Sequence, residues 1–325
     1  MQFRTELTPD KLPLALQLTD RIVTIGSCFA EVMGQRLADH KLTTTVNPFG
    51  TLFNPTSIAK LITLSLTGGT PDEALYLQRD GLWFHYDFHS SFWANTRDEL
   101  ANRLLQVLVN VGKVVCEANW LLLTLGSAVV YWHRESGQIV ANCQKMPGTF
   151  FDKYLCPIDT IRAALTSLLS LLRRHNPGLQ IVLTVSPVRH VRDGLTLNGA
   201  SKALLRTLCA EMPPLDAQTH YFPAYELMLD DLRDYRFYEA DLIHPNAQAH
   251  DYVFGKFVEA AFSPELCTFV SAWATIRQGL GHRPLYGSTA AYRQFLTRLL
   301  AQIDALPAVI DTTAERAEVQ SRLLD

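Results

Sequence analysis

A serine and a cysteine end the first apolar run of the sequence, in the stretch TIGSCFAE over residues 24–31. Gly26 permits a tight exit from a strand, and Ser27 and Cys28 then fall at the start of a helix. Free N–H groups and the helix dipole at such a position stabilise an anion, which lowers the pKa of a thiol and favours the reactive thiolate. This stretch leaves open the commoner alternative, in which Ser27 caps the helix and Cys28 packs inward.

An acid and an imidazole stand three residues apart in DLIHPNAQAH. Asp241 and His244 precede a helix that Asn246 can cap. A carboxylate that orients an imidazole prepares it to act as a general base, as in Ser-His-Asp triads. The motif therefore offers Cys28 a base, although Asp241 could equally serve a backbone turn and His244 could lie on the surface.

An arginine and a histidine follow a later apolar run, in SPVRHVRDG. Arg189 and His190 would lie at the same sheet edge as Cys28, because ligands bind beyond the carboxyl ends of parallel strands. Arg189 can bind a substrate carboxylate or phosphate, or form a structural ion pair with a buried acid. We expect His89 on the substrate side as well.

Two histidines and an aspartate in FHYDFH raise the question of a metal ion. On a strand, His85, Asp87 and His89 share one face and, with Cys28 and Cys143, would offer metal-ligating side chains. The aromatic neighbours favour a packed surface instead. We expect no metal and no cofactor, and keep a Cys/His metal site as an alternative.

Five short apolar runs with β-branched residues have the length of buried strands. Helical patterns alternate with them, which predicts a parallel sheet covered on both faces in a three-layer α/β/α fold. The expected strands cover 21–26, 42–46, 120–126, 180–186 and 219–223. The expected helices cover 28–39, 56–66, 97–110, 157–178 (with Asp159 as its cap), 198–211 and 246–261.

Two segments, 81–93 and 129–144, interrupt this alternation, and the second predicts a hairpin with ESG as its turn. From residue 263 onward the patterns are helical, without another strand. We therefore predict an α/β domain over 1–262 and a C-terminal helical extension over 263–325, packed on the core or on a partner subunit. The extension offers a surface for a homodimer.

The composition excludes several classes of protein. A chain of 325 residues, 48% hydrophobic and 19% charged, can bury a large core. Its 29 basic residues nearly balance 32 acidic ones, and no basic run could follow a phosphate backbone, which argues against nucleic acid as a partner. The N-terminal segment fits neither a secretory signal nor a membrane span, so we expect a cytoplasmic protein. Six scattered cysteines without a C-x-x-C pair argue against a disulfide scaffold.

The pentapeptide Gly26–Ala30 and the DLIHPN block resemble the GSCFA family, which is named after that pentapeptide. The resemblance extends over about residues 20–260, through VNPFGTLFNP, DFHSSF, LGSAVVY, ANCQKMP, VSPVRHVRDG and NGASKALLR. The family is similar to the SGNH, or GDSL-type, hydrolases. This resemblance implies a flavodoxin-like parallel sheet, which the five expected strands fit.

The resemblance also implies roles for single positions. The G-D-S turn of these hydrolases falls on residues 26–28, which makes Cys28 the nucleophile and gives Ser27 a supporting place, with Ser27 itself as the alternative nucleophile. The backbone N–H groups of Cys28 and Gly50 would bind the oxyanion. The D-x-x-H block falls on Asp241 and His244.

The third block of the hydrolases departs from their pattern. Gly126 is kept as a candidate oxyanion residue, but Ala128 stands where those enzymes have an amide donor. Loss of one oxyanion donor can cost about 3–4 kcal/mol of transition-state stabilisation. Asn54 and Asn142 are candidates to fill the gap, and turn chemistry is an equal alternative for both.

These features together predict an SGNH-type acyl-ester hydrolase or acyltransferase. We expect its substrate to be an acylated small molecule or carbohydrate. Two alternatives belong to other classes: a catalytically silent ligand-binding module, suggested by Ala128, and the Cys/His metal site.

Overall fold

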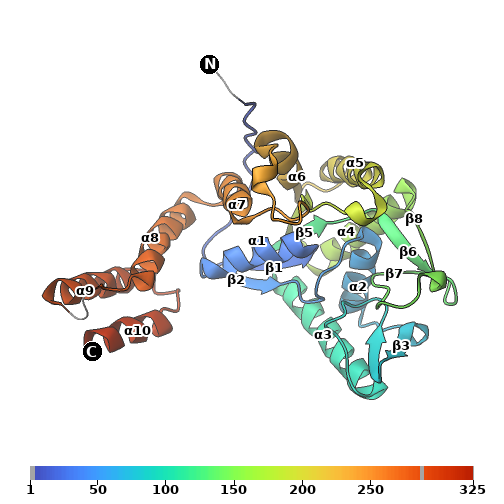
Figure 1. The fold of residues 1–325 in the computed structure, drawn as a ribbon, viewed down its shortest axis with the longest axis horizontal. Helices are drawn as coiled ribbons and strands as arrows, with labels where there is room; N and C mark the ends of the chain where they lie inside the picture. The colour runs from blue at the N-terminus through green and yellow to red at the C-terminus, as the bar shows by residue number, and fades with distance from the viewer. Residues whose placement is uncertain (1–3, 286–288, 325) are drawn as a thin grey trace.

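The computed structural model describes residues 4–285 and 289–324. Its centre is a five-stranded parallel sheet in the order β10-β9-β5-β1-β2, which is the flavodoxin-like strand order (Figure 1). Its strands are β1 Arg21–Gly26, β2 Thr43–Val46, β5 Trp120–Leu125, β9 Gln180–Val185 and β10 Thr219–Tyr221. All five expected strands are confirmed, and β5 and β9 are buried along their whole length, as strands covered on both faces must be.

Helices follow the strands at nearly the expected positions. The helices are α1 Cys28–Asp39, α2 Pro55–Thr67, α3 Arg97–Glu117, α4 Ile158–His175, α5 Leu195–Glu211, α6 Ala224–Glu226, α7 Ala247–Ala261, α8 Pro264–Gly281, α9 Ala290–Asp304 and α10 Thr313–Leu324. Asn246 caps α7 as predicted, by accepting the N–H of Ala249. The cap predicted for α4 is wrong, because Pro157 holds that position and Asp159 pairs instead with Arg162 one turn on.

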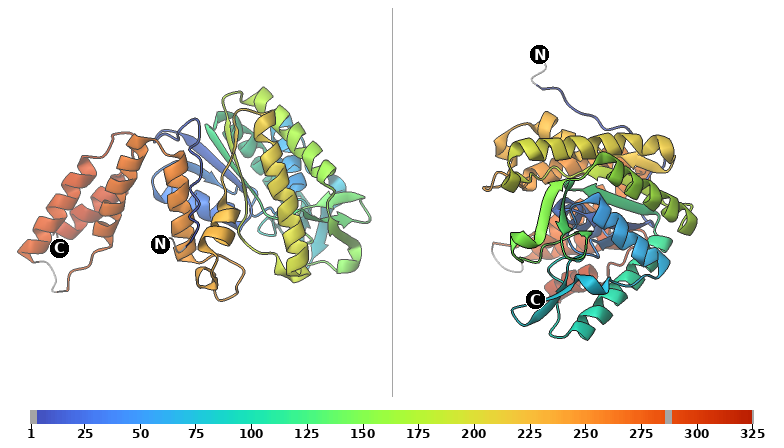
Figure 2. Two further views of the ribbon diagram at one scale, coloured as in Figure 1. Left: turned by 90° about the horizontal axis from the view of Figure 1, so that it is seen from above. Right: turned by 90° about the vertical axis from the view of Figure 1, so that its right-hand side faces the viewer.

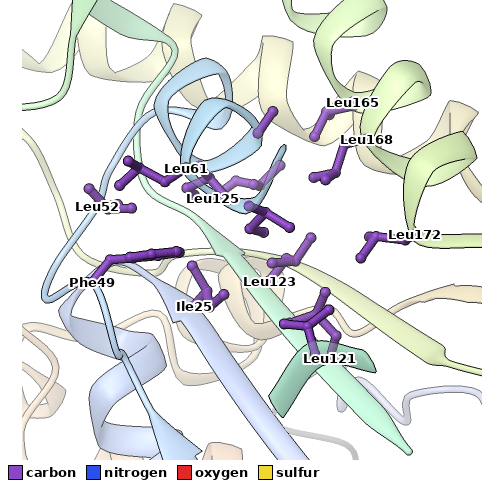
Figure 3. Packing of buried hydrophobic residues seen from close by; sticks show 14 of the residues in the cluster. Ile25, Phe49, Leu52, Leu61, Leu121, Leu123, Leu125, Leu165, Leu168 and Leu172 are labelled. Atoms are coloured by element: carbon purple, nitrogen blue, oxygen red, sulfur yellow. The ribbon is translucent and has the colours of Figure 1, made fainter. Parts of the chain in front are cut away.

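Two apolar clusters make the sheet the middle of three layers. One face packs against α2, α3, α4 and α5, and Figure 3 shows leucines of β5 meeting those of α2 and α4. The other face packs against α1 and α7. The predicted three-layer α/β/α fold is therefore confirmed, and the carboxyl ends of the parallel strands lie together at one edge.

Two small antiparallel sheets explain the interrupted pattern. The predicted hairpin is present as β6 Val129–His133 and β7 Gln138–Val140, and β8 Phe151–Leu155, which was not predicted, pairs with β6. The segment 81–93 contributes β4 Leu82–His85, paired with β3 Tyr76–Arg79. Because β4 ends at His85, the expectation that one strand face carries both histidines of this segment is wrong.

The helices α8, α9 and α10 extend away from the sheet (Figures 1 and 2). Their base contacts the end of α1, where the Trp273 Nε1–H donates to the Asp39 carbonyl over 2.7 Å and Lys41 pairs with Glu315 over 2.7 Å. Their buried side chains belong to the same apolar cluster as α1 and α7. Among the described residues, no helix is both long enough and apolar enough to span a membrane.

Candidate active site

The junction between β1 and α1 is a tight turn that requires glycine. Gly26 has φ +147°, and a Cβ there would lie 2.1 Å from the Thr124 carbonyl oxygen of the neighbouring strand. Ser27 donates its N–H to that same oxygen over 3.1 Å, and its Oγ accepts the N–H of Phe29 over 3.3 Å as the helix cap. Cys28 is thereby placed as the first residue of α1.

The Cys28 thiol lies half-buried at this helix start. Burial raises the pKa of this thiol. Hydrogen bonds from the N–H groups of Phe29 and Cys28, and the positive charge of Lys202, lower it by less. The expectation that the helix terminus lowers this pKa is therefore wrong in direction, because desolvation outweighs the N–H groups. A thiol in this state needs a base before it can attack.

The D-x-x-H motif forms an oriented imidazole. Asp241 Oδ2 lies 2.7 Å from His244 Nδ1, and Asp241 Oδ1 accepts the backbone N–H groups of Ile243 and His244 over 2.9 and 3.0 Å. The hydrogen bond to His244 is the largest cause that lowers the Asp241 pKa to about 2. The carboxylate thus stays charged at neutral pH and fixes the ring, the division of labour that a general base requires.

The loops that carry the thiol and the imidazole lie at the same edge of the sheet. Cys28 follows β1, and the Arg189 N–H, just beyond β9, donates to the Ile243 carbonyl beside His244 over 3.3 Å. No hydrogen bond joins His244 to the Cys28 sulfur within the described chain. Catalytic hydrogen bonds are often long in unliganded enzymes and tighten when substrate binds.

The two glycine amides predicted as oxyanion donors are engaged in turns. The Gly50 N–H donates to the Asn47 carbonyl over 2.7 Å, and the Gly126 N–H donates to the Phe53 carbonyl over 2.8 Å. A Cβ at Gly50, whose φ is +70°, would lie 2.6 Å from the His89 Cβ. Glycine at position 50 therefore permits the turn and its close packing against His89.

The two asparagines considered as replacement donors have different surroundings. Asn54 caps α2, because its Oδ1 accepts the Ser57 N–H over 2.7 Å. Asn142 accepts the Gln144 N–H over 2.8 Å and lines a cleft. The Ala128 N–H donates to the Ser201 Oγ over 2.7 Å, which stabilises the loop where the hydrolases have their amide.

A cleft of about 1010 Å³ opens beside the loops that follow β5 and β9. Of the predicted residues, it brings together Asn142, Cys143, Arg189 and His190. Ile243, the neighbour of His244, also lines it, whereas Cys28 and His244 themselves are not among its lining residues. The cleft therefore reaches the loop that carries His244 without enclosing the thiol or the imidazole.

Arg189 and His190 present different chemistry to this cleft. The Arg189 guanidinium lies over the rings of Tyr238 and Tyr235, 4.2 and 5.2 Å from their centroids. In the part of the chain that the structure describes, no ion pair joins Arg189 to an acid. The His190 Nε2 is buried without a hydrogen-bond partner, and burial is the main cause that lowers the His190 pKa to about 4, so the ring is neutral at neutral pH.

The residues of the alternative metal site lie in separate surroundings. Both ring nitrogens of His85 contact the backbone: Nε2 lies 3.0 Å from the Asp72 carbonyl, and Nδ1 accepts the N–H of Asp87 over 3.1 Å. Asp87 pairs with Lys60 over 2.6 Å. Across residues 4–285 and 289–324, no three His, Cys, Asp or Glu side chains are gathered closely enough to hold a metal ion.

Lys202 is a site residue that the sequence analysis missed. It is 1% exposed, and its Nζ donates to the carbonyls of Gly126 and Ser186, each over 2.7 Å. These carbonyls directly follow β5 and β9, at the sheet edge that carries the candidate site. Burial lowers the Lys202 pKa to about 7, and Cys28 opposes that change. The available signal was the helical spacing: Lys202 stands three residues before Leu205, on the apolar face of α5, where a lysine is unusual.

Comparisons with solved structures give matches of low identity. A carbohydrate esterase family 3 protein from Talaromyces cellulolyticus is 10% identical with a TM-score of 0.35, and the match covers 78% of this chain and 99% of that one. An acetyl xylan esterase from the rumen bacterium Butyrivibrio proteoclasticus is 12% identical with a TM-score of 0.34, covering 75% of this chain and 64% of the other. We assign no activity on these similarities.

Comparisons of sequence are more decisive about the family. No curated protein matches the chain. Two family models do match: the GSCFA family over residues 21–257, and the GSCFA domain protein, C-terminal domain, over residues 273–325. The first match spans more than half of the chain and includes both the Gly26–Ala30 turn and the D-x-x-H motif, so this chain belongs to the GSCFA family.

Proposed function

We propose that this chain is an acyl-ester hydrolase or acyltransferase that uses Cys28 as its nucleophile and acts on an acylated small molecule or carbohydrate. The observation that carries the proposal is the 2.7 Å contact between Asp241 and His244 at the sheet edge where α1 presents the thiol. The resemblance of these blocks to GDSL-type hydrolases supports it.

In the proposed reaction, the His244 Nε2 accepts the proton of the Cys28 thiol while Asp241 holds Nδ1 in place. The sulfur attacks the acyl carbonyl, and a thioester forms as the leaving oxygen takes a proton from the imidazolium. Water or another nucleophile then attacks the thioester and releases the thiol. Among the described residues the Cys28 N–H, unlike those of Gly50 and Gly126, has no backbone carbonyl partner, which leaves it as the backbone oxyanion donor, and the positive charge of Lys202 acts on Cys28.

Mass spectrometry of the Cys28 peptide tests this chemistry directly. Incubation with a panel of activated esters and thioesters should leave a hydroxylamine-sensitive acyl group on that peptide. Cys28→Ala should abolish the adduct, and His244→Gln should slow its formation by about 100-fold or more. Cys116, an exposed cysteine, provides the matched control, since Cys116→Ala should react as the unaltered protein does.

The same experiment distinguishes the Ser27 hydroxyl from the Cys28 thiol as the nucleophile. Ser27→Ala should retain acyl transfer, because Ser27 is buried and its Oγ caps the helix. Cys28→Ser should retain little transfer. Turnover in Cys28→Ala, or an acyl group on Ser27, would overturn the assignment of Cys28.

A catalytically silent ligand-binding module is the second candidate. The specific observation in its favour is that the Gly50 and Gly126 amides donate to protein carbonyls rather than pointing to a free oxyanion position. Saturable ligand binding without any adduct on Cys28 across the ester panel would favour this candidate over the enzyme.

A further inference from the structure

The cleft beside the candidate site carries an excess of positive charge. Lys145, Lys153, Arg189 and Arg192 line it, against the single carboxylate of Asp193. Lys153 pairs with that carboxylate, so the other three cations remain. The whole chain has a formal net charge of −3, so the cleft is more positive than the chain as a whole.

A strained turn presents Lys145 to the cleft. Gln144 and Lys145 have φ of +50° and +59°, a left-handed conformation that costs non-glycine residues about 1–3 kcal/mol each. The buried Gln144 amide maintains the turn by donating to the carbonyls of His85 and Phe88 over 2.9 and 2.8 Å. The exposed Lys145 ammonium is thus carried on a fixed support, and strain kept in this way is typical of functional loops.

The two arginines come from the loop after β9. The Arg189 guanidinium lies over the Tyr238 ring, 4.2 Å from its centroid, and this contact leaves its positive charge in place. Arg192 is exposed in the same short loop. Within residues 4–285 and 289–324, none of Lys145, Arg189 and Arg192 forms an ion pair. Three cations that line one cleft and are not paired with its single carboxylate, Asp193, are the donor set that phosphate and carboxylate groups prefer.

His190 adds an unused hydrogen-bonding group to the same cleft. Its Nε2 is buried and has no partner, and its ring makes an edge contact with Phe53 at 5.1 Å. A buried polar atom without a partner is costly, which favours a small turn of the ring that would bring Nε2 to a ligand oxygen in the cleft. The positive charges of Lys202 and Lys153 both lower the pKa of His190, which is the effect expected of a positive field in this part of the cleft.

We infer that this cleft binds a small anionic molecule that carries phosphate or carboxylate groups, and that the acyl compound of the proposed reaction is therefore negatively charged. The second half of this inference rests on the proposed function, whereas binding of the anion does not. The volume of about 1010 Å³ suits a molecule of cofactor or metabolite size.

Calorimetry on the Cys28→Ala chain tests the binding apart from any chemistry. Inorganic pyrophosphate and citrate are the two probes, so that the tighter binder identifies phosphate or carboxylate as the preferred group. The Lys145→Gln/Arg192→Gln double variant should weaken binding by about tenfold or more, since it removes two charged donors. The Lys113→Gln/Arg174→Gln double variant makes the same charge change at exposed positions outside the cleft and should bind like the parent.

A second readout reports on the cleft wall itself. A bound anion favours the charged imidazolium, so pyrophosphate should raise the His190 pKa above its starting value of about 4 in an NMR titration, with His190→Gln assigning the signal. Saturable binding that is lost in the cleft variant supports the inference. No saturation by either probe at millimolar concentration, or equal affinity in the two double variants, would overturn it. A chain that binds pyrophosphate but never acylates Cys28 would refute the proposed chemistry and leave the anion site standing.

Discussion

At the scale of single residues, Lys202 has the least ordinary environment in the site. Lys202 is 1% exposed and its Nζ contacts two carbonyls, and among the described residues it pairs with no carboxylate, so its positive charge is costly. The cost is offset in part by the strand ends of β5 and β9, whose carbonyls would otherwise be unpaired. Its electrostatic coupling to Cys28 gives this arrangement a chemical consequence, because a positive charge favours the thiolate.

Replacement of Lys202 should therefore change the pKa of the Cys28 thiol, on which it acts through its charge alone. Lys202→Met removes the positive charge at similar volume, and we expect the Cys28 pKa to rise further. The rate of iodoacetamide alkylation at the Cys28 peptide, measured against pH, gives that pKa. Alkylation of the exposed Cys116 in the same samples is the internal control. An unchanged Cys28 profile in a folded variant would show that Lys202 has a structural role alone.

Burial of Lys202 also makes stability depend on pH. Its pKa is about 7 in the folded chain against an ordinary 10.5, so between these values the unfolded chain binds the extra proton. The free energy of unfolding should consequently rise with pH across this window, by at most about 1.4 kcal/mol per pH unit. Urea unfolding at several pH values should show this rise in the unaltered protein and not in Lys202→Met. Parallel curves for the two proteins would contradict the lowered pKa.

At the scale of elements, the β1–α1 junction positions the thiol through backbone geometry. The turn needs Gly26 because the adjacent β5 strand passes within van der Waals reach of any added carbon. It also needs Asn47, whose Oδ1 accepts the Gly26 N–H over 2.9 Å from the end of β2. Three neighbouring strands thus determine where one sulfur atom lies.

A single methyl group should disrupt that junction. Gly26→Ala places a Cβ 2.1 Å from the Thr124 oxygen in a backbone conformation with φ +147°, and we expect it to cost at least about 3 kcal/mol. Gly199→Ala is the matched control, because that glycine lies inside α5 with no atom within 4 Å of an added Cβ. The control should stabilise the protein by about 0.5–1 kcal/mol. Equal unfolding free energies for the two variants, measured in urea, would show that the turn relaxes.

At the scale of the whole molecule, the C-terminal helices continue one of the two apolar clusters of the α/β body. Trp273 is 3% exposed and joins α8 to the end of α1. We retain the predicted domain boundary between residues 262 and 263 as a proposal, which limited proteolysis would test. The homodimer also stays a proposal, which light scattering would test. The family matches end at 257 and resume at 273 on either side of that boundary.

Loss of the Trp273 side chain should weaken this junction. Trp273→Ala removes a buried indole and should cost about 3–5 kcal/mol of unfolding free energy. Trp93 is 44% exposed, so Trp93→Ala should cost less than about 1 kcal/mol. Chemical unfolding followed by circular dichroism measures both. A Trp273→Ala protein as stable as Trp93→Ala would show that the extension contributes little to the stability of the body.

The sequence by itself determined the five strands of the central sheet, most helices, the hairpin and the D-x-x-H pair, because hydrophobic period and local turn chemistry act over a few residues. Tertiary structure decided the rest, since burial and long-range contact have no local signature. It reversed the expected direction of the Cys28 pKa, committed the Gly50 amide to a turn, and placed Lys202 under the strand ends. It also gathered Lys145 and Arg192, which stand 47 positions apart in the sequence (192 − 145), on one cleft.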